Sequence, residues 1–426
     1  MKAYQDMNRE ELMSLHTDLS KQYNNIKSLG LNLNMARGKP DFAQTELSLA
    51  ILDIVNSHYD FGEKMEYCNY GILDGIPEAK EFFAEILETT PEHMIIYGNS
   101  SLTIMFDQIS RGYTHGYLGN TPWCQLEKVK FLCPVPGYDR HFAITEHFGI
   151  EMINIPLYED GPDMDMIEKL VNNDECIKGI WCVPQYSNPS GIIYSDEVVK
   201  RFSQLQPAAK DFRLFWDNAY IVHHLYDEHK QVLNILSECE KNDNADIVFE
   251  FCSTSKITLP GAGVAALATS LANKKDILSH MSIQCIGHDK LNQLRHIEYF
   301  NKVENLDIHM QKQAALLRPK FEAVLDIFNK ELNGLGIGQW TKPLGGYFIT
   351  FESLHNCAKD IIEKCKEAGT ILTSAGAPFP YGKDPLDSTI RIAPSYPTLE
   401  ELKQATELFT LCVKLVSVEK LLSQMN

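Results

Sequence analysis

The feature that most constrains the fold is a series of short apolar runs, separated by segments that are long enough to form helices. The runs lie at residues 94–97, 129–133, 151–157, 177–183, 212–216 and 246–252. Strands that are apolar on both faces are typical of a sheet buried between two layers. Parallel strands also need helical crossovers, so this spacing predicts an α/β domain with a mainly parallel sheet covered by helices on both sides.

A different pattern follows this domain. Residues 297–332 alternate polar and apolar side chains with a helical period, which predicts one or two helices. Beyond them the chain predicts an α+β unit, with strands at 346–351 and 389–393 and helices at 356–369 and 398–422. No repeat or Gly/Ser-rich linker marks the junction, so the domain boundary near residue 300 is approximate.

Composition narrows the classes of function. The chain has 39 Lys and Arg against 57 Asp and Glu, a net charge of −18, which argues against a protein that neutralises nucleic-acid phosphates. Its 11 cysteines include no C-x-x-C pair, so neither a disulfide framework nor a zinc site is expected. The first residues are polar, and no apolar run reaches the roughly 18 residues that cross a bilayer. We therefore expect a cytoplasmic enzyme that acts on small molecules.

Polar segments follow most of the predicted strands. They lie at 98–101, 134–138, 184–191, 217–220 and 253–256. In an open parallel sheet, ligands bind beyond the carboxyl ends of the strands, so these segments are expected to meet. Ser100 and Ser101 fall at the start of a predicted helix, whose free N–H groups can bind phosphate. Each segment alone is equally typical of a helix cap or a turn.

Taken in order, the five segments resemble those of the fold-type I pyridoxal-phosphate enzymes, and specifically of the class I aminotransferases. Two further segments extend the resemblance, Ala-Arg-Gly-Lys-Pro-Asp-Phe at 36–42 and Arg-Ile-Ala-Pro-Ser at 391–395. Arg-Gly-Lys-Pro, Pro-Gly-Tyr-Asp-Arg-His-Phe and Ser-Thr-Ser-Lys-Ile-Thr look most like a divergent bacterial subgroup of aspartate aminotransferases.

The resemblance implies an aspartate aminotransferase-like fold with two domains. The large, cofactor-binding domain has a sheet of the seven-stranded type and is placed at residues 46–300. A smaller α+β domain is placed at 301–426. Residues 1–45 are expected to form an N-terminal arm that packs with the small domain.

The resemblance also implies which residues hold pyridoxal 5'-phosphate. Lys256 would bind it covalently as a Schiff base and move a proton during catalysis. Asp217 would keep the pyridine nitrogen protonated, so that the ring can accept electrons. Tyr220 and Asn188 would hydrogen-bond the phenolic oxygen, and Tyr138 would stack on the ring.

For the phosphate group, the resemblance assigns Ser100, Ser101, Ser253 and Ser255. It also assigns Tyr70 of a neighbouring subunit, which implies a homodimer. The sequence departs from the family in one respect: many relatives carry an arginine shortly after the catalytic lysine, whereas residues 257–264 contain no basic side chain.

Substrate recognition is the last property that the resemblance suggests. Arg391 would pair with the α-carboxylate, helped by Gly38 and Asn188. A dicarboxylate needs a second cation, for which Arg37, Lys39, Arg140 and Arg295 are candidates. The expected reaction is transfer of the amino group of L-aspartate to 2-oxoglutarate, giving oxaloacetate and L-glutamate.

Other interpretations stay open within the enzyme class. The protein could be an aminotransferase for alanine, an aromatic amino acid or 2-aminoadipate, or a pyridoxal-phosphate lyase, because a fold does not determine a reaction. Outside that class, some transcription regulators carry an aminotransferase-like ligand-sensing domain. They add an N-terminal DNA-binding module, and only a short arm precedes residue 36 here.

Two other motifs are weaker. Residues 261–266 match the relaxed dinucleotide pattern G-x-G-x-x-A, but they do not directly follow a predicted strand, and no acid lies about 20 residues on. We expect these glycines to allow close backbone packing instead. His223, His224 and His229 match no zinc-ligand spacing, so no metal site is expected.

Overall fold

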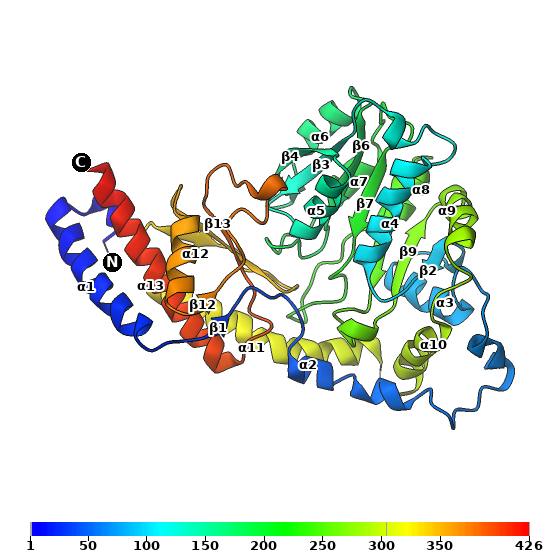
Figure 1. Ribbon diagram of the computed structural model, residues 1–426, viewed down its shortest axis with the longest axis horizontal. Coiled ribbons are helices and arrows are strands. Elements are labelled where there is room, and N and C mark those ends of the chain that lie inside the picture. The colour runs from blue at the N-terminus through cyan, green and yellow to red at the C-terminus, as the bar shows by residue number, and fades with distance from the viewer. Residues whose placement is uncertain (1, 304, 426) are drawn as a thin grey trace.

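The computed structural model describes residues 2–303 and 305–425 and shows two lobes (Figure 1). The larger lobe surrounds a wide sheet. The smaller lobe contains both ends of the chain, where the N-terminal helix α1 lies beside the C-terminal helix α13. A long helix, α11, runs along one edge of the molecule and links the two lobes.

The large sheet confirms the α/β prediction. In the described residues it has eight strands, where the resemblance implied a sheet of the seven-stranded type, and their order is β2-β9-β8-β7-β6-β3-β4-β5. The additional strand at the edge is the two-residue β5. Strands β8, β7, β6, β3 and β4 are mutually parallel, whereas β9 is antiparallel to both of its neighbours and β5 is antiparallel to β4. The bounds are β2 (Met94–Ile96), β3 (Lys130–Val135), β4 (Glu151–Tyr158), β5 (Gly161–Pro162), β6 (Ile177–Cys182), β7 (Arg213–Asp217), β8 (Val248–Ser253) and β9 (Ala265–Thr269).

All six strands predicted in this region are present, but the sequence predicted neither β5 nor β9. Strand β9 is rich in alanine, and it begins at Ala265, within the last two positions of the glycine pattern at 261–266. Residues 265–268 are fully buried between β2 and β8. Because the glycines precede this strand instead of following one, the segment lacks the strand-then-glycine order of a dinucleotide-binding turn.

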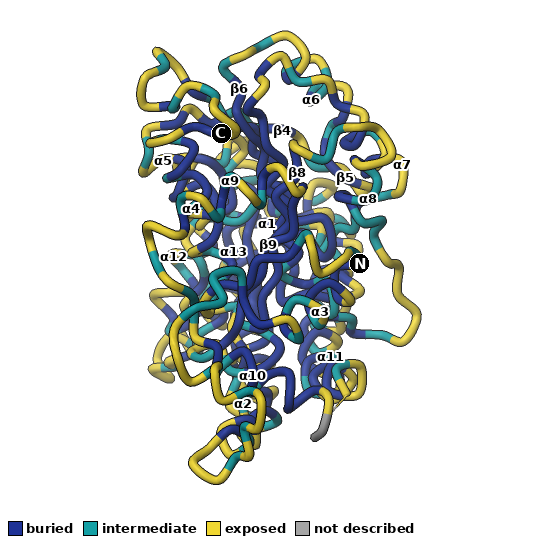
Figure 2. Tube along the Cα trace, turned by 90° about the vertical axis from the view of Figure 1, so that its right-hand side faces the viewer, coloured by how far each residue is buried: buried dark blue, intermediate teal, exposed yellow. Residues whose placement is uncertain are grey.

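Helices cover both faces of the sheet because alternate strand residues point to opposite sides. Leu214 and Trp216 belong to one apolar core, and Phe215 between them belongs to another. The first core is covered by α3 (Pro77–Ile86), α6 (Met164–Val171), α7 (Asp196–Ser203), α8 (Ile235–Glu240) and α10 (Lys290–Glu298). The second is covered by α4 (Ser101–Thr114), α5 (Asp139–His147) and α9 (Leu271–Gln284). Figure 2 shows the strands as the buried centre of this lobe.

The small lobe is an α+β unit, as predicted. Its antiparallel sheet has the order β10-β11-β13, and a two-residue parallel ladder joins β1 to β12. The strands are β1 (Leu33–Asn34), β10 (Gly338–Trp340), β11 (Ile349–Ser353), β12 (Thr370–Ile371) and β13 (Thr389–Ile392). The helices are α1 (Arg9–Lys27), α11 (Leu306–Leu332), α12 (Ala358–Glu367) and α13 (Leu399–Gln424).

Two segments of the chain connect the lobes. Helix α1 buries Leu12 and Leu19 in the core of the small lobe, and the chain then continues to α2 (Phe42–Glu46), which contacts α11. Within 297–332, where one or two helices were predicted, α10 ends at Glu298, a short π-helix η8 (Tyr299–Val303) follows, and α11 then continues through Pro319.

Short 3-10 helices complete the structure. They are η1 (Tyr4–Asp6), η2 (Leu49–Asp53), η3 (Gly62–Cys68), η4 (Pro91–His93), η5 (Trp123–Gln125), η6 (Ala245–Ile247), η7 (Pro260–Ala262) and η9 (Pro380–Gly382). Among the described residues, no helix combines the length and apolar character needed to cross a membrane.

Candidate functional site

Most of the predicted site residues line one cavity of about 210 Å³ at the carboxyl ends of the central strands. Each strand or the loop after it contributes a side chain, as expected for an open α/β sheet. The predicted residues on its wall are Gly38, Ser100, Ser101, Tyr138, Asn188, Asp217, Tyr220, Ser253, Ser255 and Lys256. Arg391 and Tyr70 are the two predicted residues that do not line it.

Lys256 lies in a turn just beyond the end of β8. Its Nζ is 4.5 Å from the centre of the Tyr220 ring. Burial raises the pKa of the Tyr220 hydroxyl well above its usual range and raises the pKa of Tyr138 to about 12. Both phenols therefore stay protonated at neutral pH and can donate hydrogen bonds beside the lysine.

Asp217, the last residue of β7, is a buried carboxylate with one oxygen uncommitted. Its Oδ2 lies 3.0 Å from Nε2 of His141, whereas its Oδ1 has no hydrogen-bond partner among the described residues. Buried polar atoms are rarely left unpaired. The uncommitted oxygen therefore fits an N–H donor on a bound ligand.

His141 was not predicted as a site residue. Its ring stacks on Trp181 with a centroid distance of 4.4 Å, and the Trp181 Nε1–H donates to Thr145 Oγ1 at 2.8 Å. This stack fixes the imidazole against Asp217. Nothing in the sequence indicated the contact, because the two residues are 76 positions apart. From the sequence, His141 is simply a residue in the first turn of a helix.

Hydroxyl groups gather at the N-terminus of α4. Ser100 is its N-cap residue, and its side chain makes no capping hydrogen bond. The Ser253 hydroxyl donates to Ser255 Oγ at 3.2 Å, and Ser255 donates to the Asn99 carbonyl at 2.7 Å. A helix N-terminus with free N–H groups and nearby hydroxyls suits a phosphate. Among the described residues, the cations on the cavity wall are Lys39 and Lys256.

Arg391 lies on β13 of the small lobe and reaches toward the cavity. Its Nη1 is 2.9 Å from Asp139 Oδ1 and 3.5 Å from Asn188 Oδ1, and Thr373 Oγ1 accepts from Nε and Nη2 at 3.3 and 3.2 Å. The guanidinium also stacks over Phe348. Asp139, which the sequence did not suggest, thus occupies a position where a ligand carboxylate would pair with Arg391.

Gly38 has a steric reason to be glycine. A Cβ at this position would lie 2.1 Å from Cζ of Phe348, the ring that supports Arg391. Only glycine lets the 36–42 segment approach this ring, so its backbone can reach the cavity next to the arginine.

The four candidate distal cations separate clearly. Lys39 lines the cavity, and its Nζ is 4.2 Å from the centre of the Tyr396 ring. Arg37 and Arg140 are exposed, as Lys39 is, but they do not line the cavity. Arg295 on α10 donates to the Val55 carbonyl at 3.3 and 3.4 Å, so it is committed elsewhere in this subunit.

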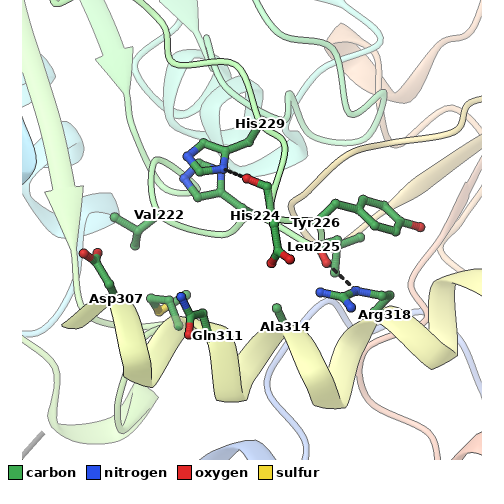
Figure 3. Close-up of a pocket in the computed structure, with 11 residues that line it drawn as sticks. Val222, His224, Leu225, Tyr226, His229, Asp307, Gln311, Ala314 and Arg318 are labelled. Atoms are coloured by element: carbon green, nitrogen blue, oxygen red, sulfur yellow. Dashed lines mark hydrogen bonds between the residues drawn. The ribbon is translucent and has the colours of Figure 1, made fainter. Parts of the chain in front are cut away.

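The three histidines beyond Tyr220 do not converge. His223 is buried near Tyr220 and Tyr347, and burial lowers its pKa to about 3. His224 and His229 stack with ring centres 3.6 Å apart beside a separate cavity of about 360 Å³, which is bounded by α11 (Figure 3). Among the described residues no group of three His, Cys, Asp or Glu side chains is arranged to hold a metal ion.

The residues of the first cavity fit pyridoxal phosphate. Asp217 Oδ1 offers an acceptor for the pyridine N–H, and the serines with the N-terminus of α4 offer donors for the phosphate. Lys256 supplies the amine between these two ends. The chemistry of this donor set therefore agrees with the expected cofactor.

Comparisons with known proteins show what the whole chain is similar to. Residues 7–425 match the sequence model of a family described as aspartate amino-transferase. The chain is 43% identical to an aspartate aminotransferase of Corynebacterium glutamicum over 98% of this chain and 97% of that protein. The crystal structure of an aspartate transaminase from the same species has a TM-score of 0.95 at 42% identity, covering 98% of this chain and 99% of that one.

A more distant structure shares the fold. An α-aminoadipate aminotransferase from Thermus thermophilus, in complex with N-(5'-phosphopyridoxyl)-L-leucine, has a TM-score of 0.72 at 19% identity, over 92% of this chain and 93% of that chain.

Asp217→Ala is expected to weaken pyridoxal-phosphate binding about 10- to 100-fold, the range for losing a hydrogen bond to a charged group. Titration of the cofactor into stripped protein, followed by absorbance, measures this. Asp196→Ala removes an exposed acid outside the cavity and is expected to bind like the unmodified protein. Equal affinity in Asp217→Ala would contradict the assignment.

Asp139→Asn is expected to tighten binding of succinate about 3- to 10-fold, because a carboxylate ligand no longer competes with a charged partner for Arg391. Calorimetric titration of the cofactor-loaded protein gives the dissociation constant. Glu146→Gln on the same helix is the control, since Glu146 is exposed and outside the cavity. Weaker succinate binding in Asp139→Asn would show that Asp139 orients Arg391 instead of competing for it.

Proposed function

The chain belongs to the aspartate amino-transferase family, and on that premise we propose that it transfers the amino group of L-aspartate to 2-oxoglutarate, with pyridoxal 5'-phosphate as cofactor. The observation that carries the choice of a dicarboxylate is the presence of Lys39 on the cavity wall in addition to Arg391 beside it. The 43% identity to an aspartate aminotransferase over nearly the whole chain supports the same choice.

The cofactor supplies a ring that accepts electrons from the substrate's α-carbon. Asp217 would hold a proton on the pyridine nitrogen through its free Oδ1, and His141 keeps the other oxygen in place. Tyr220 and Asn188 would donate hydrogen bonds to the phenolic oxygen. Tyr138 would cover one face of the ring.

Lys256 is the residue that moves a proton. Its Nζ would remove the proton from the substrate's α-carbon and return one later in the reaction. The Tyr220 ring lies beside this amine and limits the directions that it can take, so the same nitrogen stays within reach of the reacting atoms.

The phosphate would be held by Ser100, Ser101, Ser253 and Ser255. The family's usual arginine is missing from 257–264, and the N-terminal dipole of α4 would supply part of the balancing charge.

Arg391 would bind the α-carboxylate, with Asn188 and the backbone of Gly38 beside it. Asp139 would compete with the substrate there, because its carboxylate already occupies Nη1 of this guanidinium. Where the substrate's carboxylate takes the place of Asp139 at Arg391, the ion pair that joins the two lobes would be lost.

Lys39 would bind the distal carboxylate. Arg37, Arg140 and Arg295 are less suitable, since in this subunit they lie outside the cavity. Lys39 and Gly38 are adjacent in one short segment, so neighbouring residues would contact the α-carboxylate and the distal carboxylate of the substrate.

We further propose a homodimer and the predicted division of the chain. Residues 46–300 would form the cofactor-binding domain, residues 301–426 the small domain, and residues 1–45 the arm. Tyr70, which is 77% exposed, would reach the phosphate in the partner's site. Large apolar side chains are exposed along the same part of the chain, at Phe42, Leu49, Leu52 and Met65, and such patches often mark interfaces. A cytoplasmic location stays a prediction.

Single-turnover reactions with a panel of amino acids test the substrate. Aspartate and glutamate are expected to react fastest. In steady-state assays, Lys39→Met is expected to raise KM for aspartate about 10- to 100-fold, the effect of losing one charged hydrogen bond, and to leave KM for alanine unchanged. Arg140→Met is the matched control. Faster reaction with alanine, an aromatic amino acid or 2-aminoadipate would refute the aspartate assignment, and elimination products would indicate a lyase.

Mixing inactive subunits tests the shared site. Lys256→Ala and Tyr70→Phe are each expected to be impaired, but hybrid dimers contain one intact site. An equal mixture exchanged at random is expected to recover about one quarter of the unmodified activity, because half of the dimers are hybrids with one working site of two. Sedimentation velocity verifies the dimer. No recovery in verified hybrids would mean that Tyr70 does not act across subunits.

A further inference from the structure

A group of buried polar side chains lies behind the catalytic lysine, outside the cavity. It consists of Gln44 on α2, His309 and Gln313 on α11, and Tyr347 just before β11. All four are at most 2% exposed, and none of them lines the cavity. The group joins three segments that are distant in sequence, so it owes its existence to the tertiary fold.

The two glutamines form a reciprocal pair. Gln44 Nε2 donates to Gln313 Oε1 at 2.9 Å, and Gln313 Nε2 donates to the backbone carbonyl of Gln44 at 3.2 Å. Gln44 Nε2 also donates to the Tyr347 hydroxyl at 3.1 Å. The Gln44 amide thus holds the side chain of Gln313, and the Gln313 amide holds the backbone of Gln44.

This network ends on the backbone of the catalytic turn. The Tyr347 hydroxyl donates to the Lys256 carbonyl at 3.3 Å. Gln313 Nε2 donates to the Ile257 carbonyl at 3.2 Å, and His309 Nε2 lies 2.7 Å from the same oxygen. Within the turn, the N–H of Ile257 donates to the Thr254 carbonyl. The network adds side-chain contacts to the carbonyls of Lys256 and Ile257.

At its other end the network holds the segment that carries Gly38 and Lys39. The Asp41 N–H donates to Gln44 Oε1, and Asp41 Oδ1 accepts from the Gln44 N–H, which closes the first turn of α2. Asp41 Oδ2 also pairs with Lys320 Nζ of α11 at 2.6 Å, and Lys320 donates to the Ser395 carbonyl. The 38–41 segment is therefore held on α11 at Gln313, through Gln44, and again about two turns later at Lys320.

We propose that Gln44 and Gln313, together with Tyr347, are positioning residues that fix the backbone of Lys256 relative to the 38–41 segment. They act through the lysine and touch neither substrate nor cofactor.

Removing the Gln44 amide takes the donor away from Gln313 Oε1. Removing the Gln313 amide takes a donor away from the Gln44 backbone carbonyl. Among the described residues, it also leaves His309 as the remaining side-chain partner of the Ile257 carbonyl. Loss of a hydrogen-bond partner in a buried place is unfavourable. The turn then shifts or admits water, and the Nζ loses its alignment with the α-carbon. The kinetic part of this inference rests on the proposed function.

The test compares five variants with a matched control. Gln44→Leu, Gln313→Leu and the double variant remove the pair, whereas Gln313→Glu keeps the acceptor and loses the donor. Tyr347→Phe removes one oxygen and keeps the ring, so it folds even where a glutamine variant does not. Gln293→Leu is the control, because Gln293 on α10 is equally buried but bonds only the Ile76 N–H among the described residues.

Three measurements are made on each variant. They are kcat and KM for the best amino acid substrate of the unmodified enzyme, the pH midpoint of the absorbance of the lysine-bound cofactor, and hydrogen–deuterium exchange of residues 254–262 in protein stripped of cofactor. Exchange needs neither cofactor nor substrate, so it reports on the turn even if the aspartate assignment fails.

Each single glutamine variant is expected to lower kcat about tenfold with KM within about twofold, the signature of a lost transition-state contribution. The kcat of the double variant is expected to lie within about twofold of the lower of the two single-variant values. The reason is that the effects of coupled residues are not additive. Exchange at 254–262 is expected to rise about tenfold, and the absorbance midpoint to shift, in all variants except Gln293→Leu.

Three results would overturn the inference. The first is unchanged kcat and unchanged exchange in folded Gln313→Leu and Tyr347→Phe. The second is strictly multiplicative loss in the double variant. The third is an equal loss in Gln293→Leu, which would point to general destabilisation. If exchange rises as expected while no amino acid reacts in the unmodified protein, the proposed function fails and the positioning of the turn stands.

Discussion

The site depends on the parallel register of β6, β7 and β8. Cys182 pairs with Trp216, and Asp217 pairs with Phe251, so the three strands end at the same edge of the sheet. Inter-strand hydrogen bonds hold these ends close together, and the loops that follow carry Asn188, Tyr220 and Lys256. A shift by one residue would turn each side chain to the opposite face, so this register is what places Asp217 and the loops that follow the strands at the cavity.

The second lobe adds what the sheet cannot provide. Arg391 comes from β13, and its ion pair with Asp139 of α5 bridges the two lobes at the mouth of the cavity. Helix α11 bridges them from behind, through Gln313 on one turn and Lys320 about two turns later. In the proposed function, substrate binding by Arg391 and proton transfer by Lys256 would come from different lobes. Helix α11 contacts both lobes, so buried polar contacts as well as apolar packing hold these two residues relative to each other.

The charge at this site differs in sign from the net charge of the protein. A net charge of −18 would repel dicarboxylates if it were evenly spread. The cavity wall instead presents Lys39 and Lys256 against Asp217, with Arg391 close by. Electrostatic interactions weaken with distance, and salt screens them over about 10 Å, so for a bound substrate these nearby cations would outweigh the distant surface acids.

The sequence by itself determined the local features: the six strands with their polar ends and the main helices of the small lobe, which follow from hydrophobic period. Ten residues that line the cavity were also assigned from the sequence, through motifs of a few neighbouring residues and their resemblance to a family. Strand β9 was missed because a short alanine run beside glycines has no distinctive period. Only the tertiary structure decided that His141 supports Asp217, that Asp139 pairs with Arg391, that Lys39 faces the cavity while Arg295 does not, and that Gln44 meets Gln313. The last two residues are 269 positions apart, and such contacts arise from the packing of whole elements, which leaves no pattern along the chain.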